Sequence, residues 1–305
     1  MRIGLHDADR TSFPNLALMK LSAWHKDRGD EVVWWNPMEA CDRVYSSKVF
    51  TNTPDDPYLP DDAIRGGTGY GMDAVLDDNI EHILPDYDLY GIDYAVGFLT
   101  RGCFRRCPWC IVPEKEGKLH AHASYTEFMH PDSLDFVFID NNPLGCSHGL
   151  DQIAQLAGTN ARIDFNQALD ARLIAKDEGI AELLAACRWL RPVRLACDTM
   201  GQMRSVEVAV GLLRKHDCTP KNYQCYVLVE DVESAYHRVE FLRGLGVDPF
   251  AMPFIDFKAN KPPTQEQRQF ARWVNHKAVW KSVKWSEYKG AHRGGAMEGQ
   301  RGLFA

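Results

Sequence analysis

Three cysteines within eight residues carry the clearest chemistry in this sequence. Cys103, Cys107 and Cys110 form a C-x3-C-x2-C pattern on one segment. Thiolates are the usual ligands of iron–sulfur clusters, and a 4Fe–4S cluster ordinarily takes one for each iron. Three closely spaced cysteines would leave one iron without a protein thiolate, and a metal centre needs such an open position to act on a substrate. The spacing therefore predicts a 4Fe–4S cluster with one open iron.

Two other interpretations of these cysteines stay open. Structural zinc sites usually combine two paired elements, either C-x2–4-C or H-x3–5-H. No second pair follows at a suitable spacing, because His120 and His122 are only two residues apart, as are Cys146 and His148. Free cysteines are also often small buried hydrophobes. We place zinc behind the cluster, and coincidence behind zinc, because three cysteines in so short a segment are rarely incidental.

The composition describes an acidic chain with enough apolar residues for a large core. The 305 residues are 45% hydrophobic, and 35 basic against 42 acidic side chains give a net charge of −7. This charge argues against broad electrostatic binding of nucleic acid, and nine cysteines, an odd number, do not suggest a disulfide framework. No apolar run approaches the roughly 18 residues of a membrane span. The acidic N-terminus lacks the apolar run of a signal peptide, so we expect a soluble, cytoplasmic protein with no membrane partner.

The elements that must position the cysteines begin with a strand–helix–strand unit. Residues 2–5 and 31–35 read as apolar strands, and residues 15–28 carry apolar side chains at helical spacing. Such a unit implies a parallel pair with a right-handed crossover. Residues 51–88 are rich in Pro, Asp and Gly and are expected to wrap the surface. Within them, Gly66–Gly71 does not match G-x-G-x-x-G and reads as a turn.

From residue 94 onward, six apolar strands alternate with helices. The predicted strands are 94–99, 136–140, 162–166, 193–198, 223–229 and 250–255, and helices are expected at 177–190, 205–216 and 232–245. This alternation predicts an α/β fold with a helix-covered parallel sheet, curved into a partial (β/α)6 TIM-like barrel. Sites in such folds lie at the carboxyl ends of the strands. Asp140, Asn166, Asp198 and Glu230 fall there.

The chain divides into three predicted parts. Residues 1–92 form the Rossmann-like segment with its wrapping loop, residues 93–258 the partial barrel, and residues 259–305 a helix at 264–285 with a Gly-rich disordered tail. The last helix is both basic and aromatic. Such a helix either stacks on RNA or packs its aromatic face into the core.

The cysteine segment, with Trp109 before the last cysteine, resembles the signature of the radical S-adenosylmethionine superfamily. The resemblance covers residues 94–257 and includes the six strand–helix units. The strings LTRGCFRRCPWC, FIDNN, DFNQALDARL and YVLVED resemble an uncharacterised bacterial and phage branch that adds an N-terminal Rossmann-like segment. This resemblance implies an enzyme that holds a 4Fe–4S cluster and S-adenosylmethionine. The reduced cluster would cleave the cofactor to a 5′-deoxyadenosyl radical, which would abstract hydrogen from an unidentified substrate.

The resemblance also implies a set of cofactor contacts. They are Trp109, Asp140, Asn141, Asn142, Asn166, Asp170, Arg172 and Asp198. Trp109 would help hold the adenine. Residues 140–142 stand where the family has a Gly-Gly-Glu motif for the amino group, although they lack its glycines. Arg172 would pair with the methionyl carboxylate, a role suited to a guanidinium, and Asp198 would accept from ribose hydroxyls.

Each of these contacts has an ordinary structural alternative. Asp170 and Arg172 would form a surface ion pair of little energetic value. Asn141 and Asn142 would belong to a turn before a helix. Asp198 would cap the helix that follows it.

Several neighbouring residues extend these predictions. Five cations surround the cysteines and would attract an anionic substrate or a flavodoxin- or ferredoxin-type reductant, or simply form a solvated face. They are Arg101, Arg105, Arg106, Lys115 and Lys118. Cobalamin is not expected, because the first strand ends in His6-Asp7-Ala8-Asp9 and lacks D-x-H-x-x-G. The alternatives to a radical enzyme of unknown substrate are a radical enzyme acting on nucleic acid or nucleotides, a non-catalytic iron–sulfur electron carrier, and a zinc-stabilised binding protein.

Overall fold

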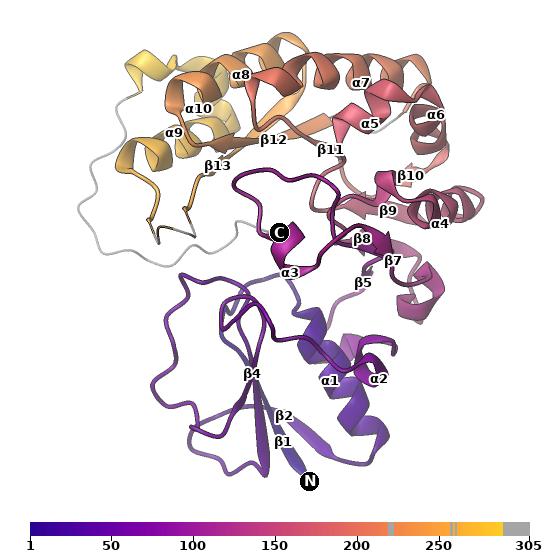
Figure 1. The fold of residues 1–305 in the computed structure, drawn as a ribbon, viewed down its shortest axis with the longest axis vertical. Coiled ribbons are helices and arrows are strands. Elements are labelled where there is room, and N and C mark those ends of the chain that lie inside the picture. Colours follow the sequence, from indigo (N-terminus) through magenta and orange to yellow (C-terminus); the bar gives the residue numbers. More distant parts are fainter. Residues whose placement is uncertain (219–222, 257–258, 260, 289–305) are drawn as a thin grey trace.

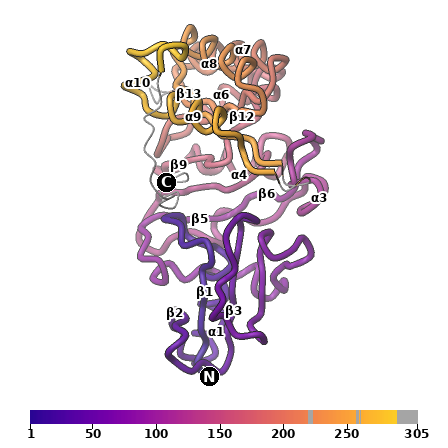
Figure 2. Tube along the Cα trace, turned by 90° about the vertical axis from the view of Figure 1, so that its left-hand side faces the viewer, coloured from indigo at the N-terminus to yellow at the C-terminus, as the bar shows by residue number. Residues whose placement is uncertain are grey.

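The protein is a mixed α/β molecule with several parallel sheets. The computed structural model describes residues 1–218, 223–256, 259 and 261–288. It is elongated, with the N-terminus at one end and helices α7 (Met203–Lys215) and α8 (Val232–Gly244) at the other, as Figures 1 and 2 show from two directions. None of the helices in the described part of the chain is both long enough and apolar enough to span a bilayer.

The N-terminal sheet has four parallel strands. They are β1 (Arg2–Asp7), β2 (Glu31–Trp34), β3 (Arg43–Ser47) and β4 (Ile64–Gly66), in the order β2-β1-β3-β4. Helix α1 (Leu16–Asp27) connects β1 to β2, and the Asn15 side chain caps it by accepting a hydrogen bond from the Leu18 N–H. The predicted strand–helix–strand unit is therefore confirmed. Strands β3 and β4 were not predicted, because they lie in polar segments without an apolar run.

The rest of the chain contains two further parallel sheets. The first has the order β10-β9-β8-β5, and the second the order β11-β12-β13. Their strands are β5 (Ala95–Gly97), β8 (Asp135–Phe138), β9 (Arg162–Phe165), β10 (Arg188–Trp189), β11 (Val193–Ala196), β12 (Tyr223–Val229) and β13 (Asp248–Pro253). An isolated parallel bridge between Leu169 and Leu195 connects the two sheets. All six predicted strands are present.

Helices cover the outer side of these strands, which curve around the loop leading into α3 (Val112–Lys115) in Figure 1. The covering helices are α4 (Ser147–Ala157), α5 (Ala171–Lys176), α6 (Glu178–Ala186), α7, α8, α9 (Gln265–Asn275) and α10 (Lys277–Ser282). Two predicted helices are shorter than expected. The helix predicted at 177–190 ends at Ala186, because the chain then enters strand β10. The helix predicted at 264–285 breaks at His276, whose backbone is not helical and whose ring nitrogen caps a new helix by accepting from the Val279 N–H.

One continuous apolar cluster fills the space between these sheets and helices. Strand β12 shows how the sequence builds it, because alternate residues of this strand are buried. The aromatic face of α9 and α10 joins the same cluster, with Phe270, Trp273 and Trp280 almost fully buried. The packing interpretation of this region is confirmed. Stacking of Trp273 or Trp280 on RNA was the wrong alternative, because neither ring is accessible.

A smaller apolar cluster connects the N-terminal sheet to the remainder. Leu16 and Met19 of α1 pack with Tyr87 and with Val96 of β5. The Tyr87 hydroxyl donates a hydrogen bond to the Phe128 carbonyl across the same junction. Val96 is fully buried, so the N-terminal sheet and its helix cover one side of β5.

Candidate functional site

The three cysteines lie on a loop that the chain closes at its base with a short antiparallel ladder. Strand β6 (Thr100–Arg101) pairs with β7 (His120–Ala121). Gly102 then turns the chain with a φ of +76°, and a Cβ atom there would lie 2.4 Å from the Lys118 carbonyl oxygen. Only glycine satisfies both conditions without rearrangement. The β6–β7 ladder thus holds the two ends of the loop side by side.

The thiols occupy one region of this loop. The Cys110 N–H donates to the Cys107 carbonyl at 3.0 Å, which makes the C-x2-C segment a tight turn. Burial raises the pKa of the Cys107 thiol, the nearby Arg172 guanidinium opposes that rise, and Cys103 adds to it. Cys110 is exposed as a residue, but partial burial of its thiol still raises its pKa, and Cys107 and Cys103 add to the rise.

Asp170 is the centre of a polar cluster around Cys103. Its carboxylate accepts hydrogen bonds from Arg172 Nε at 2.7 Å, from Arg105 Nε at 2.8 Å and from Asn142 Nδ2 at 3.4 Å. The Asp170 side chain is 7% exposed. Burial alone would raise the pKa of Asp170, but the two guanidinium groups outweigh burial and lower it. Asp170 and Arg172 are therefore not a surface pair; they bind the cysteine loop through Arg105.

The Asn142 side chain contacts Cys103 directly. Its Nδ2 donates to Cys103 Sγ at 3.6 Å, and the residue is 2% exposed. Its Oδ1 atom is buried and has no hydrogen-bond partner among the described residues. A buried carbonyl without a donor is costly, so this atom is positioned to accept from a bound molecule.

Asn141 anchors the loop on its other side. Its Nδ2 donates to Glu116 Oε2 at 2.9 Å, and the same oxygen accepts from the Gly102 N–H at 2.8 Å. The other Glu116 oxygen accepts from Arg101 at 3.2 Å. The Glu116 carboxylate at the end of the loop therefore binds both the start of the loop, at Arg101 and Gly102, and Asn141 after strand β8. Both asparagines do more than form a turn.

Asp140 closes the end of β8 against the start of β6. It is 1% exposed, and its carboxylate accepts from the Leu99 N–H, the Thr100 N–H and the Thr100 hydroxyl at 2.6–3.0 Å. Burial is the dominant influence and raises the pKa of Asp140 to about 6. Its carboxylate therefore positions the base of the cysteine loop.

Three of the predicted cofactor residues lie on the edges of this region. The Asp198 carboxylate accepts from the Leu228 N–H of β12 at 3.1 Å, and Thr199 with Gln202 forms the capping box of the next turn, so Asp198 is not the helix cap. Asn166 is 6% exposed, and its backbone carbonyl accepts from the Tyr226 hydroxyl. Trp109 is half-buried in the C-x2-C turn.

The cations around the loop have unequal roles. Arg101 forms ion pairs with Glu81 and Glu116, and the Lys115 ammonium donates to the carbonyls of Met72 and Ala74. These two side chains are occupied within the protein. Arg105 forms an ion pair with Asp170, whereas the side chains of Arg106 and Lys118 are exposed.

Cys146 and His148, the other pair considered from the sequence, lie at the start of α4. The His148 ring binds the Ala123 carbonyl at 2.9 Å. This contact gives the histidine a structural partner. Cys146 is half-buried, and its side chain makes no capping hydrogen bond to the helix.

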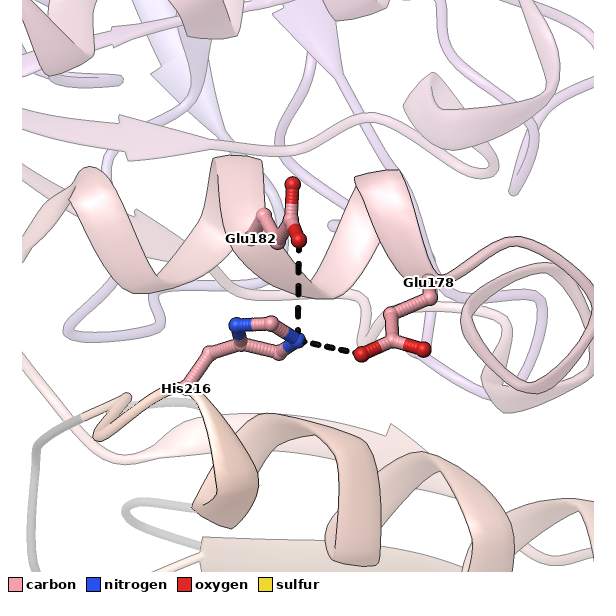
Figure 3. A group of neighbouring side chains, drawn as sticks. All are labelled: Glu178, Glu182 and His216. Atoms are coloured by element: carbon pink, nitrogen blue, oxygen red, sulfur yellow. Dashed lines mark hydrogen bonds and ion pairs between the residues drawn. The ribbon is translucent and has the colours of Figure 1, made fainter.

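One other group of described residues has the geometry of a single-ion site. Ligand atoms of Glu178, Glu182 and His216 lie within 4.8 Å of one another, the two glutamates on α6 and the histidine at the end of α7 (Figure 3). However, the Lys215 ammonium lies 2.6 Å from the same Glu178 oxygen that His216 contacts. Lys215 and His216 together lower the pKa of Glu178. This group is an ion-pair cluster that holds α6 to α7.

Sequence reasoning missed the two carboxylates that anchor the loop, Glu116 and Glu81. Nothing in their sequence spacing indicates a role, because each acts through a contact that depends on the path of the loop. No protein-family model matches the chain, and a search of curated proteins finds no match. Function therefore has to be inferred from the residues and their geometry.

Proposed function

We propose that this protein is a radical S-adenosylmethionine enzyme in which Cys103, Cys107 and Cys110 hold a 4Fe–4S cluster. The observation that carries the proposal is the buried, unpartnered Oδ1 atom of Asn142 beside Cys103. A three-thiol loop fits a cluster with one open iron, and an unpaired acceptor next to it fits the amino group of a cofactor bound there. When bound, the cluster and S-adenosylmethionine supply one-electron cleavage of the sulfonium bond and hydrogen abstraction from substrate.

The chain's own residues bind and orient the cofactor in this proposal. Asn142 Oδ1 accepts from its amino group, and Arg172 faces its carboxylate. The Asp170 carboxylate accepts hydrogen bonds from Nε and Nη2 of Arg172. The Nη1 group of Arg172 therefore remains to bind the cofactor's carboxylate. Asp198 and Trp109 contact the ribose and the adenine. Asn166 and Asp140 shape the floor of the site from the ends of β9 and β8.

We also propose that the second and third sheets form one partial (β/α)6 barrel. Strands β5, β8, β9, β11, β12 and β13 are parallel neighbours in chain order within their sheets. The Leu169–Leu195 bridge links the two sheets in the same direction. A barrel of this kind presents strand carboxyl ends at one mouth, where the cysteine loop begins.

A single zinc ion fits the three thiols less well. Tetrahedral zinc with sulfur ligands at 2.3 Å brings the sulfur atoms to about 3.8 Å from one another. Within the described residues, the three cysteines do not form a group whose ligand atoms all lie within 4.8 Å. A cluster distributes its thiolates over different iron atoms, so its ligands need not converge on one point.

The exposed side of the loop provides an approach for a reductant. Cys110 is exposed, and Arg106 and Lys118 are the exposed cations near it. A flavodoxin- or ferredoxin-type protein is acidic, so these charges favour its approach to this face. We propose a cytoplasmic location on the same ground, because such reductants and reduced thiols are found there.

The experiment that tests the proposal is cofactor cleavage by anaerobically purified, iron-reconstituted protein. We expect dithionite and S-adenosylmethionine to yield 5′-deoxyadenosine and methionine, measured by mass spectrometry, with no product from Cys107→Ala. Cys187→Ala is a matched control, because that thiol is buried away from the loop. A reducible cluster whose EPR signal is unchanged by S-adenosylmethionine would contradict the proposal and favour an electron carrier. A colourless protein with one bound zinc would also contradict it.

A further inference from the structure

A second site lies at the carboxyl end of the N-terminal sheet, and none of the three cysteines lines it. A cavity of about 330 Å³ opens there, lined chiefly by His6, Asp7, Arg10, Trp34, Trp35 and Tyr90. His6 and Asp7 end β1, and Trp34 ends β2. Its volume is at the lower end of the range for small-molecule sites, so it accommodates a metabolite and not a macromolecule.

The topology of the sheet places this cavity where parallel sheets bind ligands. The strand order is β2-β1-β3-β4, so the chain leaves β1 toward β2 on one side and later continues with β3 on the other. Ligands of parallel α/β sheets bind outside the carboxyl ends of the strands, and the cavity lies beyond these ends of β1 and β2, on the other side of β1 from β3. Strand β1 starts at the outer end of the molecule, near the N label in Figure 1, and runs toward the rest of the chain. The cavity therefore opens on the inner end of this sheet.

Aromatic rings form the walls of the cavity. Trp34 is 44% exposed although it is large and apolar, and its ring meets that of Tyr90 edge-on at 5.1 Å. Neither the Trp34 nor the Trp35 indole N–H has a hydrogen-bond acceptor within the described part of the chain. An exposed indole beside an unfilled cavity offers a stacking surface for a planar ring.

Polar groups lie at the edge of these walls. The Asp7 carboxylate accepts from the Tyr90 hydroxyl at 2.7 Å, which fixes its direction. Arg10 adopts a left-handed φ of +48°, which is strained for a residue with a side chain. Its side chain is 75% exposed, and its guanidinium forms a long ion pair of 3.6 Å with the Asp56 carboxylate. The cavity therefore combines one oriented acceptor with one exposed cation.

We propose that this cavity binds a purine nucleoside or nucleotide as a small molecule. The base stacks on the exposed Trp34 ring beside Tyr90, base N–H groups donate to Asp7, and a phosphate, if present, pairs with Arg10. Guanine suits a carboxylate best, because adjacent N–H groups on its edge face two acceptor oxygens. The proposal extends beyond the radical chemistry, because no cysteine of the loop takes part.

The test uses full-length protein with Cys103, Cys107 and Cys110 replaced by serine, so that no cluster forms. Guanosine and GMP are titrated by calorimetry. We expect saturable binding, weakened at least tenfold by Trp34→Ala and by Asp7→Asn but unchanged by Trp24→Ala. Trp24 is the matched control, because its ring stacks under Arg28 on helix α1 outside the cavity.

Three outcomes decide the proposal. Absence of binding by both ligands would overturn it, as would binding that survives Trp34→Ala. Tighter binding of GMP than of guanosine, with the difference lost in Arg10→Ala, would establish that a phosphate is recognised, and equal affinities would overturn the role of Arg10. Circular dichroism shows whether each variant folds. Because this protein has no cluster, failure here leaves cofactor cleavage by the native enzyme unaffected.

Discussion

The Asn142 carboxamide is satisfied at its nitrogen and unsatisfied at its oxygen. We expect Asn142→Ala to weaken S-adenosylmethionine binding about tenfold, or about 1.4 kcal/mol, the value of one hydrogen bond to a charged group. Equilibrium dialysis of the reconstituted protein measures this change. Iron content is measured in parallel and should be unchanged. Loss of iron with unchanged affinity per cluster would show that Asn142 holds Cys103 and not the cofactor.

Glu116 acts one step further from the chemistry, as a positioning residue. Removing its carboxylate leaves the Gly102 N–H, the Asn141 amide and Arg101 without their shared acceptor. We expect Glu116→Ala to destabilise the protein by roughly 2–4 kcal/mol and to reduce the iron bound per chain. Chemical denaturation and iron analysis measure the two effects. Glu114→Ala, at an exposed position of the same short helix, should change neither.

The pH dependence of stability reports on Asp140. Its pKa of about 6 in the folded protein exceeds the ordinary value of 3.8, so its ionisation costs the folded state more than the unfolded state. That cost is present above pH 6 and absent below about pH 4. Relative to Asp140→Asn, the wild type should therefore gain roughly 2 kcal/mol of unfolding free energy between pH 7.5 and pH 4.5. A constant difference across this interval would contradict the assignment.

At the scale of elements, a buried ion-pair chain joins the N-terminal segment to the cysteine loop. Lys20 of α1 is 4% exposed and binds Glu81, the last residue of α2 (Asp78–Glu81). Glu81 also pairs with Arg101 at 2.9 Å and with His122 at 3.2 Å. Burial alone would raise the pKa of Glu81, but His122, Lys20 and Arg101 outweigh it and hold the pKa well below its usual range.

Replacing Glu81 should therefore be more harmful than replacing an exposed carboxylate. Glu81→Ala leaves the buried Lys20 without its counter-charge and Arg101 with Glu116 alone, which costs about 3 kcal/mol of unfolding free energy. Urea denaturation measures the unfolding free energy of Glu81→Ala and of a control, Glu233→Ala, which replaces a glutamate in the first turn of α8. Because the folded-state pKa of Glu81 is depressed, its stabilisation is present above pH 4.5 and is lost as the pH falls below that value. An equal effect of the two substitutions would contradict the ion-pair chain.

The periodicity of the sequence predicted much of the order of strands and helices. The strands and helix ends that it did not predict depend on tertiary contacts. All six strands of the second part were predicted, since buried parallel strands are continuous apolar runs. Strands β3 and β4 were not predicted, because their composition is not that of a strand. They are strands because β3 pairs with β1 and β4 pairs with β3. The break at His276 likewise depends on a side chain accepting a backbone N–H.

The candidate site divides along the same line. Local spacing predicted Cys103, Cys107 and Cys110, and the family resemblance implied Asn142 and Asp170 as cofactor contacts. The contacts that bring these residues together, such as Asp170 with Arg105, join positions 65 residues apart. Spacing cannot specify such a contact, because it depends on the path of the whole loop.

At the scale of the whole molecule, the apolar cluster of Leu16, Met19, Tyr87 and Val96 packs the two parts together, and we expect it to couple their unfolding. Met19→Ala should lower the free energy of opening by about 2–4 kcal/mol in both α1 and β8, measured by native-state hydrogen exchange. Met38→Ala is the control, because Met38 is 88% exposed. A decrease confined to α1 would show that the N-terminal sheet opens independently.

The same ion-pair chain has a consequence for the order in which the protein is assembled. Arg101, at the base of the cysteine loop, is held by Glu81, and Glu81 is held by Lys20 of the first helix. Docking of the N-terminal segment therefore contributes to the final shape of the loop. This segment leaves the ribosome before the cysteines do, whereas Asn141 and Asp170, which also anchor the loop, leave it later. In the proposed enzyme, iron would therefore be inserted after both parts have folded, and a delivery protein would meet a loop already shaped to receive the cluster.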